Sequence, residues 1–382
     1  MTVWDTIAGS RAALGIAKQL AFDAAPHAWL LLGPSGSGKR PLSVAMAAAL
    51  NCPEEPGVGC GRCSTCLRTL RHQHPDVHHI LPEGPLIPVD VIREIVVPEA
   101  ARSPFEASRK VFIVEEADRM NPPAQNALLK TLEEPQPDTT FILISEHEEE
   151  LLPTIHSRCV VMRLEPIARD ELTTLLTNDG ASALDADVAA RAADGDLEHA
   201  RRIAFDADSQ RRRKRWLEIP RRLTSPSDAM DTAAELLDEA KIAVKELEVS
   251  QRNEVQELAD AMGEGRGTAS VRQALAKRHK RELRRLEQDV IVEALQVVGS
   301  FYRDVLLVRH SNEEAAGNVD IMDELKQWAG SDLSDAVLAE AAHRCVEAQS
   351  GIPLNANATL AVEATFLELA RSVGPPFGAH VA

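Results

Sequence analysis

The pattern of apolar and polar positions divides this chain into an alternating first part and a helical second part. Within residues 1–165, short apolar runs alternate with amphipathic stretches, and the clearest runs are residues 28–32, 111–114 and 141–144. Continuous apolar runs of this length, bounded by charged or turn residues, are typical of strands that are buried on both faces. Their alternation with helices predicts an α/β domain with a parallel sheet over residues 1–165.

No strand pattern follows this domain. Glu165 and Pro166 mark its end, because the residue before a proline is disfavoured in a helix. Residues 166–205 are expected to form two or three short helices, and residues 206–382 are expected to be entirely helical.

The helical part contains a charged segment at about residues 229–285. Residues 229–260 predict one long helix, and the glycine-rich residues 263–267 are expected to end it. The apolar stripe of this helix consists of Leu236, Ala240, Ala243 and Leu247.

The charge of the chain argues against free-standing DNA binding. There are 42 Lys and Arg against 59 Asp and Glu, a net charge of −17 over 382 residues, and aromatic residues make up only 3%. Binding to phosphates needs clustered cations, and base stacking needs aromatic side chains. We therefore interpret the two basic runs, residues 211–215 and 277–285, as solvated helix faces. The same observations disfavour the function of a stand-alone DNA-binding regulator.

The sequence contains no membrane or secretion signal. No apolar run reaches 18 residues, and the first residues lack the basic and apolar regions of a signal peptide. We expect a cytoplasmic chain that does not cross a membrane.

A phosphate loop follows the first predicted strand and precedes an Ala-rich helix. The loop consists of Gly33, Pro34, Ser35, Gly36, Ser37, Gly38 and Lys39. Its glycines allow backbone N–H groups to converge on phosphate oxygens, and the lysine reaches the outer phosphates. The next residue is Arg40, at the position where a Ser or Thr normally binds Mg²⁺. Because a guanidinium cannot bind a cation, the loop can hold phosphate but its metal site is impaired.

The apolar run at residues 111–114 resembles a Walker B strand. It is followed by Glu115 and Glu116, which we expect at the end of the strand that faces the phosphates. Glu115 stands where Asp is usual, and the extra methylene disturbs an octahedral Mg²⁺ site. Glu116 stands where a base would polarise water.

Four cysteines lie close together in one Gly/Pro-rich segment, residues 51–67. Cys52, Cys60, Cys63 and Cys66 have the spacing C-x7-C-x2-C-x2-C. Four thiolates in a reducing compartment predict a structural Zn²⁺ site, and disulfides are the alternative. Metal binding would supply the folding energy that this short segment cannot obtain by burial. Cys159 and Cys345 are isolated, and we expect both to be core thiols.

Residues 117–135, with Ser157, Arg158 and Cys159 after the next strand, closely resemble the AAA+ clamp-loader subunits of bacterial DNA polymerase III. The cysteine module after the phosphate-loop helix fits the same family. Two branches share these features, the ATP-hydrolysing gamma/tau subunits and the delta prime subunits.

Residue details favour the delta prime branch. A gamma/tau subunit would be expected to carry Thr after the loop lysine, Asp before Glu in the Walker B strand, and Arg three residues after the lid glycine. Here these positions hold Arg40, Glu115 and Glu198, the last following Gly195. The resemblance extends over the whole chain, and the segment at 229–285 resembles the actinobacterial form. Its other matching positions are Trp4, Gly9, residues 27–30, residues 301–304 and the closing helix at 355–369.

The resemblance implies an AAA+ domain (1–165) with an inserted zinc module (51–67), a helical lid (166–205) and a helical collar (206–382). The implied role is to stabilise a clamp-loader ring with gamma/tau and delta subunits, which loads the sliding clamp onto primed DNA. Little or no ATPase activity and no polymerase chemistry are expected of the isolated chain, while ATP binding without turnover stays open. The alternative is an active gamma/tau-type ATPase motor.

Two further site residues follow from the resemblance. Arg158 would reach a neighbouring subunit's ATP in trans and neutralise charge on the transferred phosphate. A local salt bridge is the alternative for this arginine. Ser145 lies at the family's sensor position, and a strand-end cap is its alternative.

Overall fold

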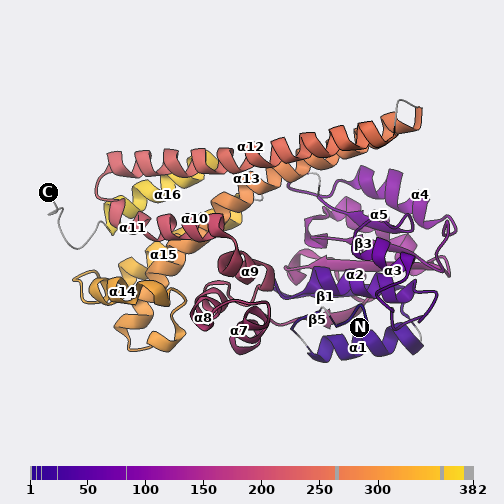
Figure 1. Ribbon diagram of the computed structural model, residues 1–382, viewed down its shortest axis with the longest axis horizontal. Coiled ribbons are helices and arrows are strands. Elements are labelled where there is room, and N and C mark those ends of the chain that lie inside the picture. Colours follow the sequence, from indigo (N-terminus) through magenta and orange to yellow (C-terminus); the bar gives the residue numbers. More distant parts are fainter. Residues whose placement is uncertain are drawn as a thin grey trace. The chain divides into compact units, whose positions relative to one another are not determined.

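The chain consists of two compact units, Met1–Phe205 and Asp206–Ala382. The structure is a computed structural model that describes residues 2–5, 7–9, 11–23, 25–82, 84–262, 266–352 and 357–373 (Figure 1). The expected lid therefore belongs to the first compact unit. Among the described residues, no helix combines the length and the apolar character needed to cross a membrane.

A five-stranded parallel sheet forms the centre of the first unit, with the strand order β2-β3-β4-β1-β5 (Figure 1). The strands are β1 (Ala28–Leu32), β2 (Val77–Ile80), β3 (Lys110–Val114), β4 (Thr139–Ser145) and β5 (Val160–Arg163). The apolar pattern predicted β1, β3 and β4. It missed β2 and β5, which are the two edge strands, because an edge strand need not be apolar on both faces. His78 and His79 interrupt β2, and three of the four residues of β5 are exposed.

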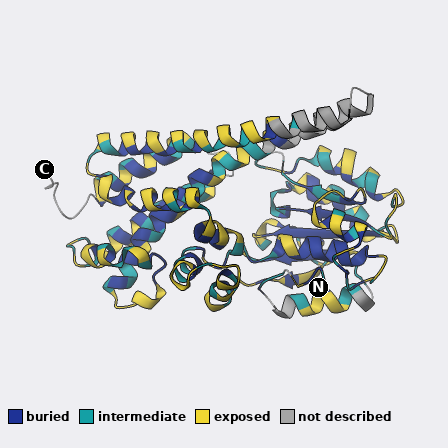
Figure 2. Cartoon of the chain, viewed as in Figure 1, coloured by how far each residue is buried: buried dark blue, intermediate teal, exposed yellow. Residues whose placement is uncertain are grey.

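Alternate residues of the central strand β1 face two separate cores. Trp29 and Leu31 pack in one core, and Leu30 and Leu32 pack in the other. This period of two explains why the run is apolar at every position. Figure 2 shows the sheet as the most deeply buried part of this unit.

Helices cover both faces of the sheet. The first core contains α1 (Arg11–Asp23), α2 (Lys39–Leu50) and α3 (Ser64–Leu70). The second contains a π-helical turn (Val91–Val96), α4 (Val97–Ala100), α5 (Pro122–Glu133) and α6 (Pro153–His156). Short 3₁₀ turns lie at Ala117–Arg119 and Glu148–Glu150. The parallel sheet with helices on both faces confirms the predicted α/β domain.

Three helices follow the sheet and share a small core of their own. They are α7 (Arg169–Asn178), α8 (Ala183–Ala192) and α9 (Leu197–Phe205). Ile167, Leu172 and Ile203 are among the buried residues of this core. Gly195 precedes α9 with a φ of 91°, and a Cβ there would lie 2.4 Å from Cβ of Pro166, so only glycine fits this turn.

The second unit is helical throughout its described residues. Its helices are α10 (Ala207–Leu217), α11 (Ile219–Arg222), α12 (Pro226–Met262), α13 (Arg266–Arg309), α14 (Met322–Ala329), α15 (Asp335–Gly351) and α16 (Ala358–Ser372), with 3₁₀ turns at Glu313–Ala315 and Val319–Ile321. Phe301 packs edge-to-face on Trp328 in its core, with ring centroids 5.2 Å apart.

The charged segment at 229–285 lies in the two longest helices, α12 and α13. The predicted stripe faces inward, because Leu236 and Ala240 are buried and Ala243 and Leu247 are half-buried. The break predicted at residues 263–267 falls where α12 ends and α13 begins, but the prediction is wrong for Arg266 and Gly267, which belong to α13, and residues 263–265 lie outside the described residues. Similarly, Asn355 and Ala356 of the expected closing helix lie outside them, and α16 begins at Ala358.

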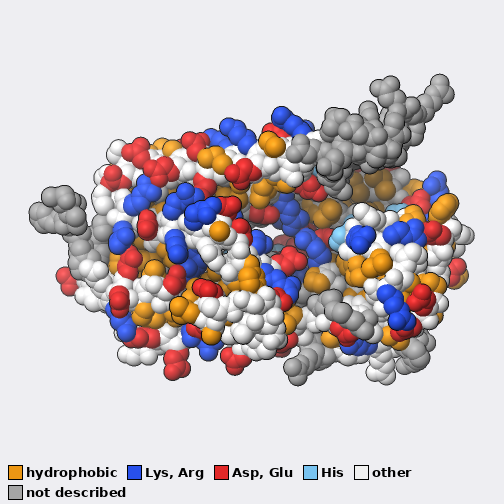
Figure 3. Space-filling model, in the orientation of Figure 1, with side chains coloured by type: hydrophobic (Ala, Val, Ile, Leu, Met, Phe, Trp, Pro, Cys, Tyr) orange, Lys and Arg blue, Asp and Glu red, His pale blue; other side chains and the backbone are white. Residues whose placement is uncertain are grey.

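The interpretation of the first basic run as a solvated face is wrong for Arg213. The exposed arginines of this run gather over α10 (Figure 3). Arg213 instead is only 6% exposed. Its two terminal nitrogens donate to Asp320 over 2.6 and 2.9 Å, and Nη2 also donates to Asn318 over 2.7 Å. Tertiary packing thus turns one member of a basic run into a structural residue.

The same network continues to α13. The Asn318 side chain donates to Asp304 over 2.8 Å, and the fully buried Asp304 also accepts the backbone N–H groups of Gly317 and Asn318. Arg213 therefore fastens α10 to the loop between α13 and α14. In the second basic run, Lys280, Arg284 and Arg285 are exposed, as a solvated face requires, while the side chains of Lys277, Arg278 and Arg281 lie outside the described part.

We expect Arg213→Ala to lower the free energy of unfolding of the second unit by about 1 to 3 kcal/mol, because it removes the hydrogen-bond donors to the buried Asn318 side chain and to the Asp320 carboxylate, which is 25% exposed. The matched control is Arg211→Ala, in the same helix. Arg211 is exposed and pairs with exposed Asp208, so its loss should change stability by less than about 0.5 kcal/mol. Urea unfolding followed by circular dichroism measures both, and equal losses would contradict this assignment.

Candidate functional site

The phosphate loop connects β1 to α2 in the geometry that its sequence predicts. Gly36 and Gly38 have φ angles of 71° and 86°, in the left-handed region that favours glycine. A Cβ on Gly33 would lie 2.3 Å from the carbonyl oxygen of Leu164, so the chain leaving β5 passes directly over the start of the loop. The loop glycines are thus required by both backbone conformation and close packing.

Lys39 is bonded to its own loop. Its Nζ donates to the carbonyl oxygens of Gly33 and Pro34, each over 2.6 Å, and lies 3.7 Å from a carboxylate oxygen of Glu146. Burial lowers the pKa of Lys39, although Glu146 opposes this effect. The ammonium group therefore donates its hydrogen bonds to loop carbonyl oxygens and not to a phosphate.

An acidic residue from the lid contacts the middle of the loop. A Cβ on Gly36 would lie 2.1 Å from Cβ of Asp196, which itself accepts the backbone N–H of His199 and so caps α9. Glu198, the acid that the sequence places three residues after Gly195, is instead exposed on the first turn of α9. Asp196 is therefore a residue that sequence reasoning missed as a site residue, since only the folded chain brings it to Gly36.

Arg40 forms an ion pair with the first acid of the Walker B strand. Its Nε and Nη2 atoms each lie 2.5 Å from Oε2 of Glu115, and Glu115 is 5% exposed. Burial raises the pKa of Glu115, but His79 and Arg40 outweigh this effect and the net pKa is lowered. The guanidinium therefore holds the carboxylate ionised in the place where a bound Mg²⁺ would otherwise do so.

A histidine pair extends this ion pair toward the cysteine module. Nδ1 of His79 lies 3.6 Å from Oε1 of Glu115, and its Nε2 lies 3.0 Å from Nδ1 of His72. His72 follows α3 in a left-handed conformation, with a φ of 57°. Burial lowers the pKa of His72, with a smaller contribution from His79. These contacts join α2, β2, β3 and the end of α3.

The other two predicted residues of the nucleotide site make local contacts. Glu116 has a left-handed φ of 52° and forms an ion pair with Arg119 at 2.8 Å. Ser145 is fully buried at the end of β4, and its hydroxyl donates to the carbonyl oxygen of His147 over 3.2 Å. The strand-end cap, one of the two interpretations of Ser145, is the contact that this structure contains.

The four predicted metal ligands lie together. The sulfur atoms of Cys52, Cys60, Cys63 and Cys66 all lie within 4.8 Å of one another, and all four residues are buried. A tetrahedral site with Zn–S bonds of about 2.3 Å places its sulfurs about 3.8 Å apart, which matches the 4.0 Å between Cys52 and Cys63. The arrangement fits a single metal ion.

Backbone N–H groups point at these sulfurs, as they do at metal-bound thiolates. Cys52 accepts from Glu55 and Cys60, Cys60 from Cys63, and Cys63 from Cys66. Burial raises the pKa of Cys52, but these donors outweigh it and lower the pKa to about 7. Burial raises the pKa of Cys66. Without a cation the cluster cannot hold four negative charges, so ionising all four thiols requires a bound metal.

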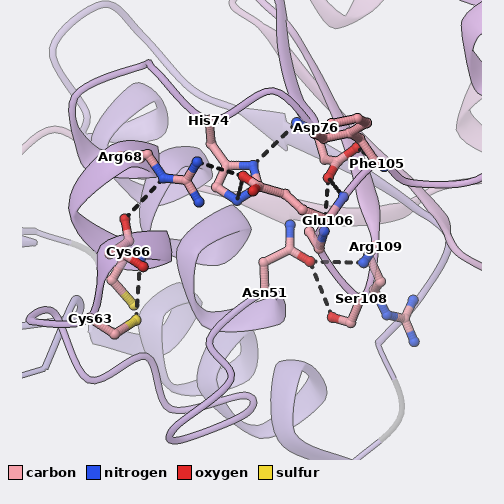
Figure 4. Close-up of polar contacts among 12 residues, drawn as sticks. Asn51, Cys63, Cys66, Arg68, His74, Asp76, Phe105, Glu106, Ser108 and Arg109 are labelled. Carbon is pink, nitrogen blue, oxygen red and sulfur yellow. Dashed lines mark hydrogen bonds and ion pairs between the residues drawn. The ribbon is translucent and has the colours of Figure 1, made fainter.

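The module is fastened to the sheet by a polar network (Figure 4). Asp76 accepts three backbone N–H groups from residues 105–107 over 2.6 to 2.9 Å. Burial raises the pKa of Asp76, but these donors outweigh it and the net pKa is lowered. Arg68 of α3 pairs with Glu106 at 2.6 Å, and Asn51 accepts from Arg109. The metal-binding segment is therefore attached to the loop before β3 at several points.

Arg158 lies at the edge of the same unit, after α6. Its Nη1 donates to the carbonyl oxygen of Thr154 over 2.9 Å and to Oγ of Ser157 over 3.1 Å, and its Nη2 pairs with Glu133. A surface cavity of about 460 Å³ is lined by His27, Leu132, Glu133, Ser157 and Arg158. The local salt bridge, the alternative from the sequence, is present, and the arginine also borders an open cavity.

Comparisons with known proteins find relatives of the first unit. Residues 10–168 match the family model described as "DNA polymerase III, delta subunit". DNA polymerase III subunit delta' of Pseudomonas aeruginosa is 45% identical over 139 residues, which is 35% of this chain and 42% of that protein. The subunit delta' of Bacillus subtilis is 36% identical over 145 residues, 38% of this chain and 44% of that protein.

A gamma subunit is a more distant relative. DNA polymerase III subunit gamma of Buchnera aphidicola subsp. Acyrthosiphon pisum is 30% identical over 175 residues, 45% of this chain and 47% of that protein. The chain thus spans less than half the length of each of these three relatives. Over residues 10–168, this chain is therefore similar to DNA polymerase III subunits, with the delta' subunits at the higher identities.

Proposed function

We propose that this chain is a delta prime subunit of a DNA polymerase III clamp loader, acting in the cytoplasm as part of the replisome. In this proposal it assembles with gamma/tau and delta subunits through its helical collar. It then supplies Arg158 to a neighbouring ATPase subunit while the assembled ring loads the sliding clamp onto primed DNA. The match over residues 10–168 supports this role, and the segment at 229–285 carries our assignment to the actinobacterial form.

The observation that carries the proposal is the ion pair between Arg40 and Glu115. A working metal-dependent ATPase site needs a hydroxyl and a carboxylate that are free to bind Mg²⁺. In this chain the hydroxyl is replaced by a guanidinium, and the carboxylate is already paired with it over 2.5 Å. Lys39 and Asp196 add to the effect, because one is bonded to loop carbonyls and the other places a negative charge beside Gly36.

The alternative is a gamma/tau-type ATPase motor. It would require Mg²⁺ to displace Arg40 from a buried carboxylate, and Lys39 to leave two short hydrogen bonds. The lid would also have to present a cation to the γ-phosphate, whereas the residue that contacts the loop is Asp196. These three contacts favour a subunit that acts on a partner's nucleotide over one that hydrolyses its own.

Arg158 is suited to act on such a partner. Its side chain is 29% exposed at the end of α6 and borders a surface cavity, so a second protein can reach it. A guanidinium can donate two parallel hydrogen bonds to a phosphate, and it stays charged at every physiological pH. In this role it would neutralise charge that develops on the transferred phosphate.

We infer that the four-cysteine cluster holds Zn²⁺ in a structural site. Its four buried sulfurs leave no open coordination position, so the metal would have no catalytic part. Bound zinc would supply a divalent charge that ionises the four thiols and would fix the start of α3. Through Arg68 and Glu106, that helix supports the loop before β3.

One Zn²⁺ should therefore bind to each chain. Elemental analysis of protein purified under reducing conditions without chelator measures the ratio directly. Replacing the ligand Cys63 with Ser should abolish stoichiometric zinc, while the same change at Cys345, a buried thiol of the second unit, should leave it at one per chain. Wild-type protein that contains no metal would contradict the zinc site.

The isolated chain should hydrolyse ATP negligibly, because Arg40 occupies the metal position. Arg40→Thr alone should not create an active enzyme, since Glu115 and Asp196 keep their places. Steady-state phosphate release measures turnover. Turnover comparable to that of a purified gamma subunit, abolished by Lys39→Ala, would show that the site is an active motor.

Arg158→Ala should leave the chain folded and able to enter the loader, but the assembled loader should lose several-fold in clamp-dependent ATP turnover. Trans arginines supply about 10³ to 10⁵ in rate in related phosphoryl-transfer systems, and a ring with several ATP sites would lose only one of them. Arg158→Lys should also lower this turnover, because the point charge of an ammonium group does not reproduce the planar guanidinium fork. Reconstitution with clamp and primed DNA, with gel filtration for assembly, measures this.

The matched control for this experiment is Arg163→Ala. Arg163 is exposed on the neighbouring strand β5 and pairs with Glu148, so it tests the loss of a surface arginine as such. Turnover should stay normal in this variant. Normal turnover by a fully assembled ring with Arg158→Ala would contradict the trans role.

A further inference from the structure

Arg158 is held against its own unit by contacts of its two terminal nitrogens, Nη1 and Nη2. Nη1 is engaged by Thr154 and Ser157, and Nη2 is engaged by the carboxylate of Glu133. The Nε atom is buried and has no hydrogen-bond partner. Three of the five N–H donors of the guanidinium are therefore engaged, and the buried Nε–H is one of the two that remain.

The unused Nε–H donor is adjacent to the occupied Nη2. Nε and Nη2 form the edge through which a guanidinium binds two oxygens of a carboxylate or phosphate at once. A phosphate that binds this edge would satisfy Nε as well as Nη2. Nη2 carries two N–H groups, and the Glu133 carboxylate that is paired with this nitrogen repels an incoming anion, so a phosphate binds the whole edge only when Glu133 withdraws.

We propose that Glu133 is a positioning residue that holds Arg158 against its own unit, and that this ion pair opens when Arg158 engages the phosphates of a neighbouring subunit's nucleotide. This inference rests on the proposed function, because the competing anion belongs to a partner. The ion pair keeps the arginine in one arrangement before assembly, and its opening is coupled to nucleotide in the neighbouring site.

The exposure of the pair makes the exchange feasible. Glu133 is the last residue of α5, with a side chain that is 47% exposed, and Arg158 is 29% exposed. Ion pairs with this much access to water are weak, and they are weakened further by salt. Glu133 can therefore restrain the arginine without holding it permanently.

The surroundings also leave room for an anion. The cavity of about 460 Å³ beside the guanidinium is lined by His27, Leu132 and Ser157 in addition to the two charged residues. Glu133 is the only carboxylate among these lining residues, so its charge is the one that an incoming phosphate meets first. Removing the charge of Glu133 should make Arg158 more accessible to an incoming phosphate.

The first experiment measures the ion pair in the full isolated chain. Phenylglyoxal modifies accessible arginines, and mass spectrometry of the peptide that contains Arg158 gives the modification rate. We expect Glu133→Gln to raise this rate by about two- to fivefold, because it removes the charge and keeps the side-chain shape. The matched control is Glu134→Gln, the adjacent exposed glutamate, which should leave the rate unchanged.

The second experiment measures the release of Arg158 from Glu133 in the reconstituted loader with clamp and primed DNA. If the ion pair must open, Glu133→Gln should lower the KM for ATP by up to about fivefold and preserve kcat, because a larger fraction of Arg158 is competent to bind. Glu133→Asp keeps the charge but shortens the side chain by one methylene, so it should give an intermediate KM. If Glu133 only supported the fold, its replacement would instead lower kcat and thermal stability.

The outcomes separate this inference from the proposed function. An unchanged modification rate in Glu133→Gln overturns the inference, whatever the loader does. A faster rate with an unchanged or higher KM overturns the release step while the trans role of Arg158 stands. A faster rate in Glu133→Gln, together with normal turnover in Arg158→Ala, overturns the proposed function and the release step with it.

Discussion

A carboxylate that is buried at the end of a parallel strand needs a cation, and the ion pair between Arg40 and Glu115 meets this need from within the chain. Glu115 is 5% exposed, and it directly follows β3. A bound Mg²⁺ in this place would share its coordination positions with a triphosphate, whereas a guanidinium has none to share. Two further contacts lie in the same loop: Lys39 donates to the carbonyl oxygens of Gly33 and Pro34, and Asp196, which directly precedes α9, lies against Gly36.

The first unit carries two arginine–glutamate pairs that differ in the burial of the acid. Glu115 is buried, so Arg40 cannot leave it without stranding a charge away from water. Glu133 is half-exposed, so water can solvate its carboxylate when Arg158 departs. In the proposed function, these similar pairs have opposite consequences: one would close the chain's own nucleotide site, and the other would keep a surface arginine ready for a partner.

The cysteine module connects to the same region through side chains of several elements. His72 follows α3, and it contacts His79, which lies 3.6 Å from Glu115. Arg68 of α3 and Asp76 hold the loop at residues 105–107. A metal at the cysteines would thus stabilise a helix that is attached to both the sheet and the loop before β3.

The sequence by itself determined the central strands and the cysteine cluster. Strands β1, β3 and β4 are buried on both faces and must be apolar at every position, and the four cysteines are close enough in sequence for a short loop to bring their sulfurs together. The replacement of a hydroxyl by Arg40 could likewise be read from one position in the loop. The edge strands β2 and β5 could not be predicted from the apolar pattern, because they contain polar or exposed residues.

Only the tertiary structure decided which partner each charged residue would have. Arg213 belongs to a basic run that is otherwise solvated, yet Asp320 and Asn318, more than 100 residues away, bury it. Asp196 reaches Gly36, far away in the sequence, and Glu133 reaches Arg158, 25 residues away, and no local pattern encodes either contact. Apolar burial leaves a periodic signal in the sequence because it depends on the element alone. The pairing of charges depends on which elements meet in space, and that is fixed only when the chain folds.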